Sequence, residues 1–144
     1  MIEGLIIVPL RTFVDARGEV RQMLRADAPH FVDFGEIYFS LVNGGMVKGW
    51  KRHQRMTLNL AVPVGRVRFV FFDDRNESPT RGETQEVILG HDAYQLTVVP
   101  PGVWNAFQGL GSGMSLVANC ASLPHDPSEA DNRPLTDPPT IVAW

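Results

Sequence analysis

The chain has 144 residues, of which 44% are hydrophobic and 20% charged, values typical of one globular domain with a buried core. A formal net charge of −3 and a pI near 5.7 argue against binding to nucleic acid or to a membrane surface. No apolar run approaches the ~18 residues that span a bilayer, and the first residues lack the pattern of a secretory signal. The only cysteine, Cys120, excludes an internal disulfide and favours a cytoplasmic location.

Short strand-like runs between glycine- or proline-marked turns follow one another along the chain. An apolar run at residues 4–10 is followed by a turn signal at Asp15-Ala-Arg-Gly18. Residues 20–31 hold the only plausible helix, and it is short. The segments predicted as strands are residues 35–42, 57–64, 66–73, 83–89, 93–99 and 114–122.

The runs 57–64 and 66–73 form the clearest pair, hinged at Pro63-Val64-Gly65. Within the second run, Val67, Phe69 and Phe71 alternate with Arg66, Arg68 and Val70. A period of two residues is typical of a half-buried strand.

From Pro124 onward the chain changes in character, because five of the eleven prolines lie there among acidic and polar residues. The chain ends in the apolar Ile141-Val-Ala-Trp144, so we expect this proline-rich segment to be an ordered wrap over the domain. Many short strands without alternating helices predict a single all-β domain over residues 1–144, either a closed barrel or a jelly roll.

The segment Lys48-Gly-Trp-Lys-Arg-His-Gln-Arg55 holds four cations and a histidine within eight residues. Like charges this close together repel one another, and an anionic ligand usually compensates. A phosphorylated small molecule is the simplest ligand of this kind. The alternative is a basic edge strand that is merely exposed to solvent.

An ordered series of short motifs covers nearly the whole chain. It consists of Asp15-Ala-Arg-Gly18, Val47-Lys-Gly49, Pro63-Val-Gly65, Asp73-Asp-Arg-Asn-Glu-Ser-Pro-Thr-Arg-Gly82, Val99-Pro-Pro-Gly-Val-Trp-Asn-Ala-Phe107, Pro124-His-Asp-Pro127, and Asp137-Pro138 ahead of Ile141-Val-Ala-Trp144. Together these motifs resemble the dTDP-4-dehydrorhamnose 3,5-epimerase family of nucleotide-sugar cupins. The resemblance implies a cupin-type jelly-roll β-barrel, a homodimer, and an isomerase of deoxysugar and polysaccharide biosynthesis that binds a nucleotide-diphosphate sugar in the barrel mouth.

The sequence differs from that family at several catalytic positions. Lys48 stands where the family has an arginine that grips phosphate, and Lys51 stands where it has the histidine that acts as the base. The general-acid tyrosine of the family aligns with Ala118, and another of its histidines aligns with Asn105. The chain is also similar to the nucleotide-sugar 3,4-ketoisomerases, whose G-x-H-x-H motif places its second histidine at His53.

A 4-keto-6-deoxy sugar carries acidic protons at C3 and C5, so its isomerisation needs a base and a cation for the developing enolate. Strand alternation places Lys51 and His53 on one face, and neighbouring cations favour the neutral imidazole that accepts a proton. We therefore predict His53 as the base, Lys51 as the group that stabilises the enolate oxygen or itself the base, and Tyr38 as the proton donor. Thr57 and Asn59 keep the phase of His53 and are predicted to bind sugar hydroxyls.

For the diphosphate we predict Lys48 together with a nearby cation, either Arg17 or Arg75. The resemblance implies that Arg17 reaches the nucleotide site of the partner subunit, and that Asn105 contacts the substrate. Many cupins hold a metal with three histidines and a glutamate, and His53 alone represents that set here. We therefore expect neither a catalytic metal nor another cofactor.

Two other functions stay open from the sequence. One is a catalytically silent cupin that binds such sugars, because the base and the acid of the family are both replaced. The other is a structural subunit with a cupin shell. Exchange of the C3 and C5 protons of a 4-keto sugar distinguishes an enzyme from both.

Overall fold

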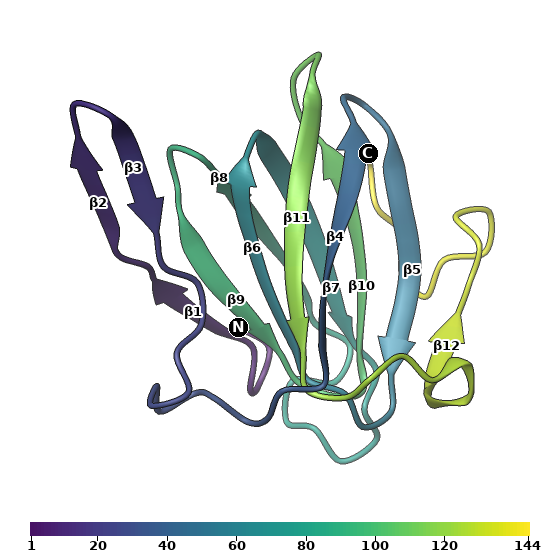
Figure 1. Ribbon diagram of the computed structural model, residues 1–144. Coiled ribbons are helices and arrows are strands. Elements are labelled where there is room, and N and C mark those ends of the chain that lie inside the picture. Colours follow the sequence, from purple (N-terminus) through teal and green to yellow (C-terminus); the bar gives the residue numbers. More distant parts are fainter.

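The computed structural model describes residues 1–144, and nearly all of its regular structure is β-strand (Figure 1). The elements are β1 (Ile6–Pro9), β2 (Thr12–Asp15), β3 (Gly18–Arg21), β4 (Glu36–Asn43), β5 (Val47–His53), β6 (Leu58–Val64), β7 (Arg66–Asp73), β8 (Thr84–Gly90), β9 (Gln95–Val99), β10 (Val103–Gly109), β11 (Met114–Ala121), the short 3-10 helix η1 (Pro127–Glu129) and β12 (Ala130–Asn132). The predicted all-β class is confirmed. No helix of the structure has the length and apolar character needed to cross a membrane.

The helix predicted within residues 20–31 does not form. β3 ends at Arg21, and the chain then runs through isolated turns closed by hydrogen bonds from Ala28 N to Arg25 O and from Phe31 N to Ala28 O. Pro29 explains the interruption, since a proline disfavours helical backbone at the residue before it.

The strands form two five-stranded sheets that face each other (Figure 1), with orders β1-β9-β6-β11-β4 and β12-β5-β10-β7-β8. All the strand pairs within them are antiparallel, and β2 and β3 form a separate hairpin that projects from the body. The expected cupin-type jelly roll is confirmed. Its two sheets are hydrogen-bonded separately and do not close into one continuous barrel.

The predicted pairing of residues 57–64 with 66–73 is wrong, because β6 and β7 belong to different sheets. The turn at Gly65 carries the chain from one sheet to the other. Gly65 has φ +85°, and a Cβ there would lie 2.2 Å from Oγ of Ser115, so both the backbone conformation and the space require glycine.

The main core lies between the two sheets and includes the three alternating residues predicted on β7, Val67, Phe69 and Phe71, which are fully buried. Val70 on the opposite face of β7 is also buried, against Trp50 and other residues of a second cluster. That strand is therefore covered on both faces rather than one.

The C-terminal segment covers the outer face of the sheet that contains β7, as expected for the proline-rich wrap. β12 pairs with β5 at the edge of its sheet, and Val142 packs on the cluster around Trp50. Trp144 lies with its ring centroid 6.1 Å from that of Trp50, and the guanidinium of Arg68 lies 5.4 Å from the Trp144 ring. Aromatic and cation–π contacts of this kind hold the end of the chain on the outer face of the sheet.

Candidate active site

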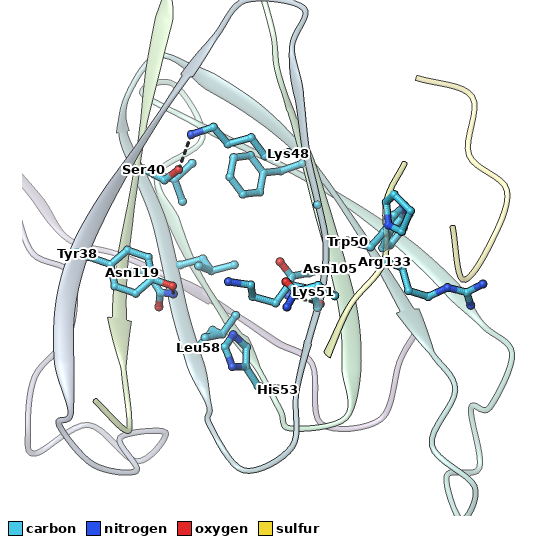
Figure 2. A pocket seen from close by; sticks show the side chains of 16 residues that line it. Tyr38, Ser40, Lys48, Trp50, Lys51, His53, Leu58, Asn105, Asn119 and Arg133 are labelled. Atoms are coloured by element: carbon cyan, nitrogen blue, oxygen red, sulfur yellow. Dashed lines mark hydrogen bonds between the residues drawn. The ribbon is translucent and has the colours of Figure 1, made fainter. Parts of the chain in front are cut away.

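A cavity of about 470 Å³ lies between the two sheets, on the side where β4 faces β5 (Figure 2). Its 16 lining residues come from β4, β5, β6, β10, β11, the end of β12 and the chain that follows it. They include Lys48 and Lys51, and no aspartate or glutamate. A cavity lined by two ammonium groups and by no carboxylate favours an anionic ligand.

An irregularity in β5 brings Lys48 onto the same wall as Lys51 and His53. The register between β10 and β5 runs from Asn105 opposite Lys51 directly to Ala106 opposite Gly49, so β5 holds one residue more than its neighbour at this point. The extra residue shifts the alternation of side chains along β5 by one position, which brings Lys48 to the face of Lys51 and His53. All three side chains line the cavity.

Gly49 allows the close approach of the two strands at this bulge. A Cβ at Gly49 would lie 2.4 Å from Cβ of Ala106, and the φ of Gly49 is +146°. Any other residue would push β5 away from β10 and change the direction of Lys48 and Lys51.

His53 is 6% exposed and its imidazole is held from behind by a carboxylate. Nδ1 of His53 is hydrogen-bonded to Oε1 of Glu129, whereas Nε2 has no partner in the protein. The other carboxylate oxygen of Glu129 accepts hydrogen bonds from the backbone amides of Arg55 (2.9 Å) and Met56 (3.0 Å). Burial alone would raise the pKa of Glu129, but these hydrogen bonds outweigh it and hold the pKa below its ordinary value.

Tyr38 stands on the opposite wall, on β4, and its hydroxyl accepts a hydrogen bond of 2.8 Å from the amide of Asn119 on β11. With its oxygen engaged as an acceptor, the phenol proton stays free to be donated. Burial raises the pKa of Tyr38, the Asn119 hydrogen bond opposes the rise, and the charge of Glu36 adds to it. The phenol is therefore protonated at neutral pH, as a proton donor must be.

The two lysines of the cavity are free of carboxylates, since no ion pair of the structure includes either. Lys51 extends into the cavity toward the wall that carries Tyr38 (Figure 2). Asn105 lies beside it and donates to its backbone carbonyl at 3.1 Å. Lys48 crosses to β4, where Nζ donates to Oγ of Ser40 (3.0 Å) and to the carbonyl of Leu41 (2.7 Å).

Thr57 and Asn59 do not line the cavity, and on β6 Leu58 and Leu60 face it instead. The prediction assumed that the alternation of side chains seen at His53 continues along one strand to Thr57 and Asn59. However, β5 ends at His53, and β6 begins at Leu58 in the other sheet. Alternation does not continue across such a break. The amide of Asn59 instead donates to the carbonyl of Cys120 at 2.9 Å.

Arg75 also lies outside the cavity, in the connection from β7 to β8. Its Nη2 contacts a carboxylate oxygen of Asp73 at 2.8 Å and the carbonyl of Glu3 at 2.7 Å. The same carboxylate accepts from the hydroxyls of Ser78 (2.6 Å) and Thr80 (2.7 Å). The Asp-Asp-Arg…Ser-Pro-Thr motif thus organises this loop and ties the start of the chain to it.

Arg17 lies at the tip of the β2–β3 hairpin, away from the cavity of its own chain, with its side chain 90% exposed and bonded to Asp15. Ala118, the position aligned with the acid of the family, does not line the cavity either. Its neighbours Val117 and Asn119 do.

Three residues of the site escaped the sequence analysis. Glu129 carried no signal, because nothing in a polar segment marks one acid as the partner of a distant histidine. Asn119 was detectable as an amide inside an apolar run. Arg133 lines the cavity, but its guanidinium points away from it (Figure 2) and is bonded to Asp137 at 2.9 Å.

A cavity between the two sheets of a jelly roll, lined by an imidazole that a carboxylate orients and by two lysines without ion pairs, is typical of a site that binds a small molecule and can carry out acid–base chemistry. The chain matches the model of the dTDP-4-dehydrorhamnose 3,5-epimerase family over residues 1–144 and belongs to that family.

Individual relatives agree with this assignment. A dTDP sugar isomerase from Desulfovibrio desulfuricans G20 superposes with a TM-score of 0.90 at 46% identity, over 92% of this chain and 85% of that one. The probable low-salt glycan biosynthesis epimerase Agl13 of Haloferax volcanii is 30% identical over 92% of this chain and 86% of its own length. A dTDP-6-deoxy-D-glucose-3,5-epimerase from Legionella pneumophila, solved in complex with dTDP-4-keto-L-rhamnose, has a TM-score of 0.82 at 25% identity over 91% of this chain and 73% of that one.

These findings confirm the expectation of a nucleotide-sugar epimerase, an enzyme of the isomerase class. They do not favour the silent sugar-binding protein or the structural subunit.

Proposed function

We propose that this chain epimerises a 4-keto-6-deoxy sugar carried on a nucleoside diphosphate, with His53 as the base. The observation that carries the proposal is the imidazole of His53, which lines a carboxylate-free cavity with Nε2 unengaged and Nδ1 bonded to Glu129. The ligand of the Legionella relative, a dTDP-linked 4-keto sugar, supports the substrate class.

In the proposed reaction, Nε2 of His53 takes the proton from the carbon next to the ketone. The electron pair of the broken C–H bond moves into the ring, and the ketone oxygen becomes an enolate oxygen that the ammonium of Lys51 stabilises. Tyr38, on the opposite wall, then donates its proton to the other face of the same carbon, which inverts the configuration. Solvent exchange restores the proton of Tyr38 and removes the one on His53.

The diphosphate is proposed to lie against Lys48, with Asn105 contacting the sugar beside Lys51. Lys48 has only neutral oxygens as partners, so its full charge is available to an anion. Lysine offers phosphate a compact point charge rather than a bidentate fork, so this contact is proposed to be sensitive to salt.

The enzyme is further proposed to be a cytoplasmic homodimer in which Arg17 reaches the nucleotide site of the partner subunit. The β2–β3 hairpin supports this, since a lone hairpin has little stability and this one exposes Phe13 (52%) and Val20 (64%) side by side. The buried free thiol of Cys120 is in keeping with a reducing compartment.

Isomerisation from a 4-keto to a 3-keto sugar is the second candidate. This reaction also begins with the loss of a C3 proton. In addition, His53, whose imidazole lines the cavity, stands at the position of the second histidine of the 3,4-ketoisomerase motif. NMR of the product formed from a dTDP-linked 4-keto-6-deoxy sugar tests both candidates. Inversion at C3 or C5 with the C4 ketone retained supports the epimerase, a ketone moved to C3 supports the second candidate, and recovery of unchanged substrate contradicts both.

A further inference from the structure

Glu129 divides its two carboxylate oxygens between two tasks. It is 2% exposed and ends η1, immediately before β12 joins the edge of β5. Oε2 accepts from the backbone amides of Arg55 and Met56, and the backbone carbonyl of Glu129 accepts from Gln54 N at 2.9 Å. These contacts hold the bend of the chain that follows β5. The structural role of the side chain therefore needs only Oε2.

The other oxygen, Oε1, contacts only the imidazole of His53 among side chains. An ionised carboxylate can accept hydrogen bonds but cannot donate them. The bond to Oε1 therefore requires the proton on Nδ1 whenever the imidazole is neutral. The lone pair is then on Nε2, the nitrogen that is buried without a partner on a side chain lining the cavity.

We infer that Glu129 is the positioning residue of His53: it selects the tautomer whose basic nitrogen faces the substrate, and it stabilises the imidazolium formed when that nitrogen takes a proton. This inference rests on the proposed role of His53 as the base. It also gives the C-terminal wrap a part in the reaction, because η1 and β12 carry the carboxylate to the back of the imidazole.

The substitution Glu129→Gln separates the two tasks. An amide has one acceptor oxygen and one donor NH2 group. The amides of Arg55 and Met56 need the oxygen, so the NH2 group is left to face Nδ1 of His53. It can only donate there, which forces the imidazole proton onto Nε2 and removes the lone pair from the cavity.

The test combines 15N NMR of the ligand-free protein with kinetics. At a pH where the imidazole is neutral, the pyridine-type signal of His53 is expected from Nε2 in the wild type and from Nδ1 in Glu129→Gln. The spectrum of His53→Asn assigns the signals. In the same variant kcat should fall by on the order of 10²–10⁴ while KM changes little. A purely structural role would lower stability without exchanging the two nitrogens.

Asp126→Asn is the matched control, because Asp126 caps the same turn through Ser128 N (3.0 Å) and Ser128 Oγ (2.7 Å) but does not contact His53. Asparagine preserves this cap, so tautomer and turnover should match the wild type. A pyridine-type signal from Nδ1 in the wild type, or an unchanged kcat in Glu129→Gln, overturns the inference. The NMR readout needs no substrate, so a wild type that turns over no sugar contradicts the proposed function and leaves the tautomer test decisive for Glu129.

Discussion

The three basic side chains of β5 that line the cavity have different partners, and their chemistry differs accordingly. His53 is bonded to a carboxylate from behind, Lys48 reaches neutral oxygens on β4, and Lys51 has no side-chain partner. A carboxylate beside Lys51 would neutralise the charge that an enolate oxygen needs. The cavity thus combines one imidazole oriented by a carboxylate with two cations that no carboxylate neutralises.

Lys51→Met tests the electrostatic role of the ammonium. Methionine keeps much of the length of the side chain and removes the charge, so turnover should fall by ~10²–10⁴ with substrate binding largely kept. Steady-state kinetics separates the two effects, with Lys51→Arg as the variant that keeps the charge and recovers part of the rate. A rise in KM with kcat unchanged would show instead that Lys51 only binds the substrate.

Lys48→Ala should weaken binding of a nucleoside diphosphate by about tenfold or more, equivalent to about 1.4 kcal/mol. The loss should shrink as salt is added, because screening already weakens the wild-type contact. Isothermal titration calorimetry measures the dissociation constant. The matched control is Arg55→Ala, which removes a cation of the same segment whose side chain is 67% exposed and lies outside this cavity. Equal dissociation constants for Lys48→Ala and the wild type would move the phosphate site elsewhere.

Strand β5 positions the basic side chains of the cavity through its bulge and its pairing with β10 and β12. Periodicity alone correctly gives Lys51 and His53 one face, since both follow the bulge. Lys48 precedes it, and strict alternation from Lys51 would have turned it to the outer face. The bulge depends on the approach of Gly49 to Ala106 on β10, a contact distant in sequence that no local pattern reveals.

The same limit explains the other differences from the sequence predictions. Thr57 and Asn59 were assigned by a phase that does not survive the change of sheet after His53. Glu129 was not predicted because its contact with His53 depends on the pairing of β12 with β5, which is distant in sequence. The fold class was predictable, because alternation and turn residues are local signals and because the motif series covers nearly the whole chain.

The loop after β7 offers a prediction on stability. The hydrogen bonds from Arg75 lower the pKa of Asp73 far below its ordinary value, burial opposes this, and the hydroxyls of Ser78 and Thr80 add to the lowering. Asp73 is fully buried, so Asp73→Asn should lower the free energy of unfolding by about 2–4 kcal/mol near pH 7.

The pH dependence follows from the direction of that shift. A carboxyl whose folded pKa is depressed contributes its full stability above its unfolded pKa, about 3.9, and loses it as pH falls toward the folded value. Urea unfolding measures the free energy of unfolding of the wild type and of Asp73→Asn. The difference between these two free energies should be constant from pH 5 to 7 and should decrease below about pH 4. A difference that widens on acidification would contradict the assignment. Turnover per folded molecule should be unaffected, since Asp73 lies away from the cavity.

The surface of the molecule exposes two apolar regions. The outer face of β4 exposes Ile37 (50%), Phe39 (62%) and Leu41 (49%), in addition to the apolar face of the β2–β3 hairpin. Surfaces of this kind usually mark an interface. With Arg17 at the tip of the hairpin, a dimer would also bring a cation from each chain toward the other.

Sedimentation velocity at micromolar concentration should give a dimer for the wild type and a monomer for Val20→Asp, because a charge on the hairpin face is costly to bury. Ile88→Asp is the control, since Ile88 is 42% exposed on β8 in the other sheet. It should remain dimeric. A wild-type monomer would contradict the homodimer, and a dimer that Val20→Asp leaves intact would place the interface away from the hairpin.

In the proposed reaction, His53 removes a proton from the carbon beside the sugar ketone. Incubation with a dTDP-linked 4-keto-6-deoxy sugar in D2O, followed by NMR, measures that step directly. The wild type should incorporate deuterium at C3, at C5 or at both, and His53→Asn should do so slower by ~10²–10⁴ with the substrate still bound. Exchange by His53→Asn at the wild-type rate would contradict this role of His53, as would a wild type that binds the sugar and exchanges none of its protons.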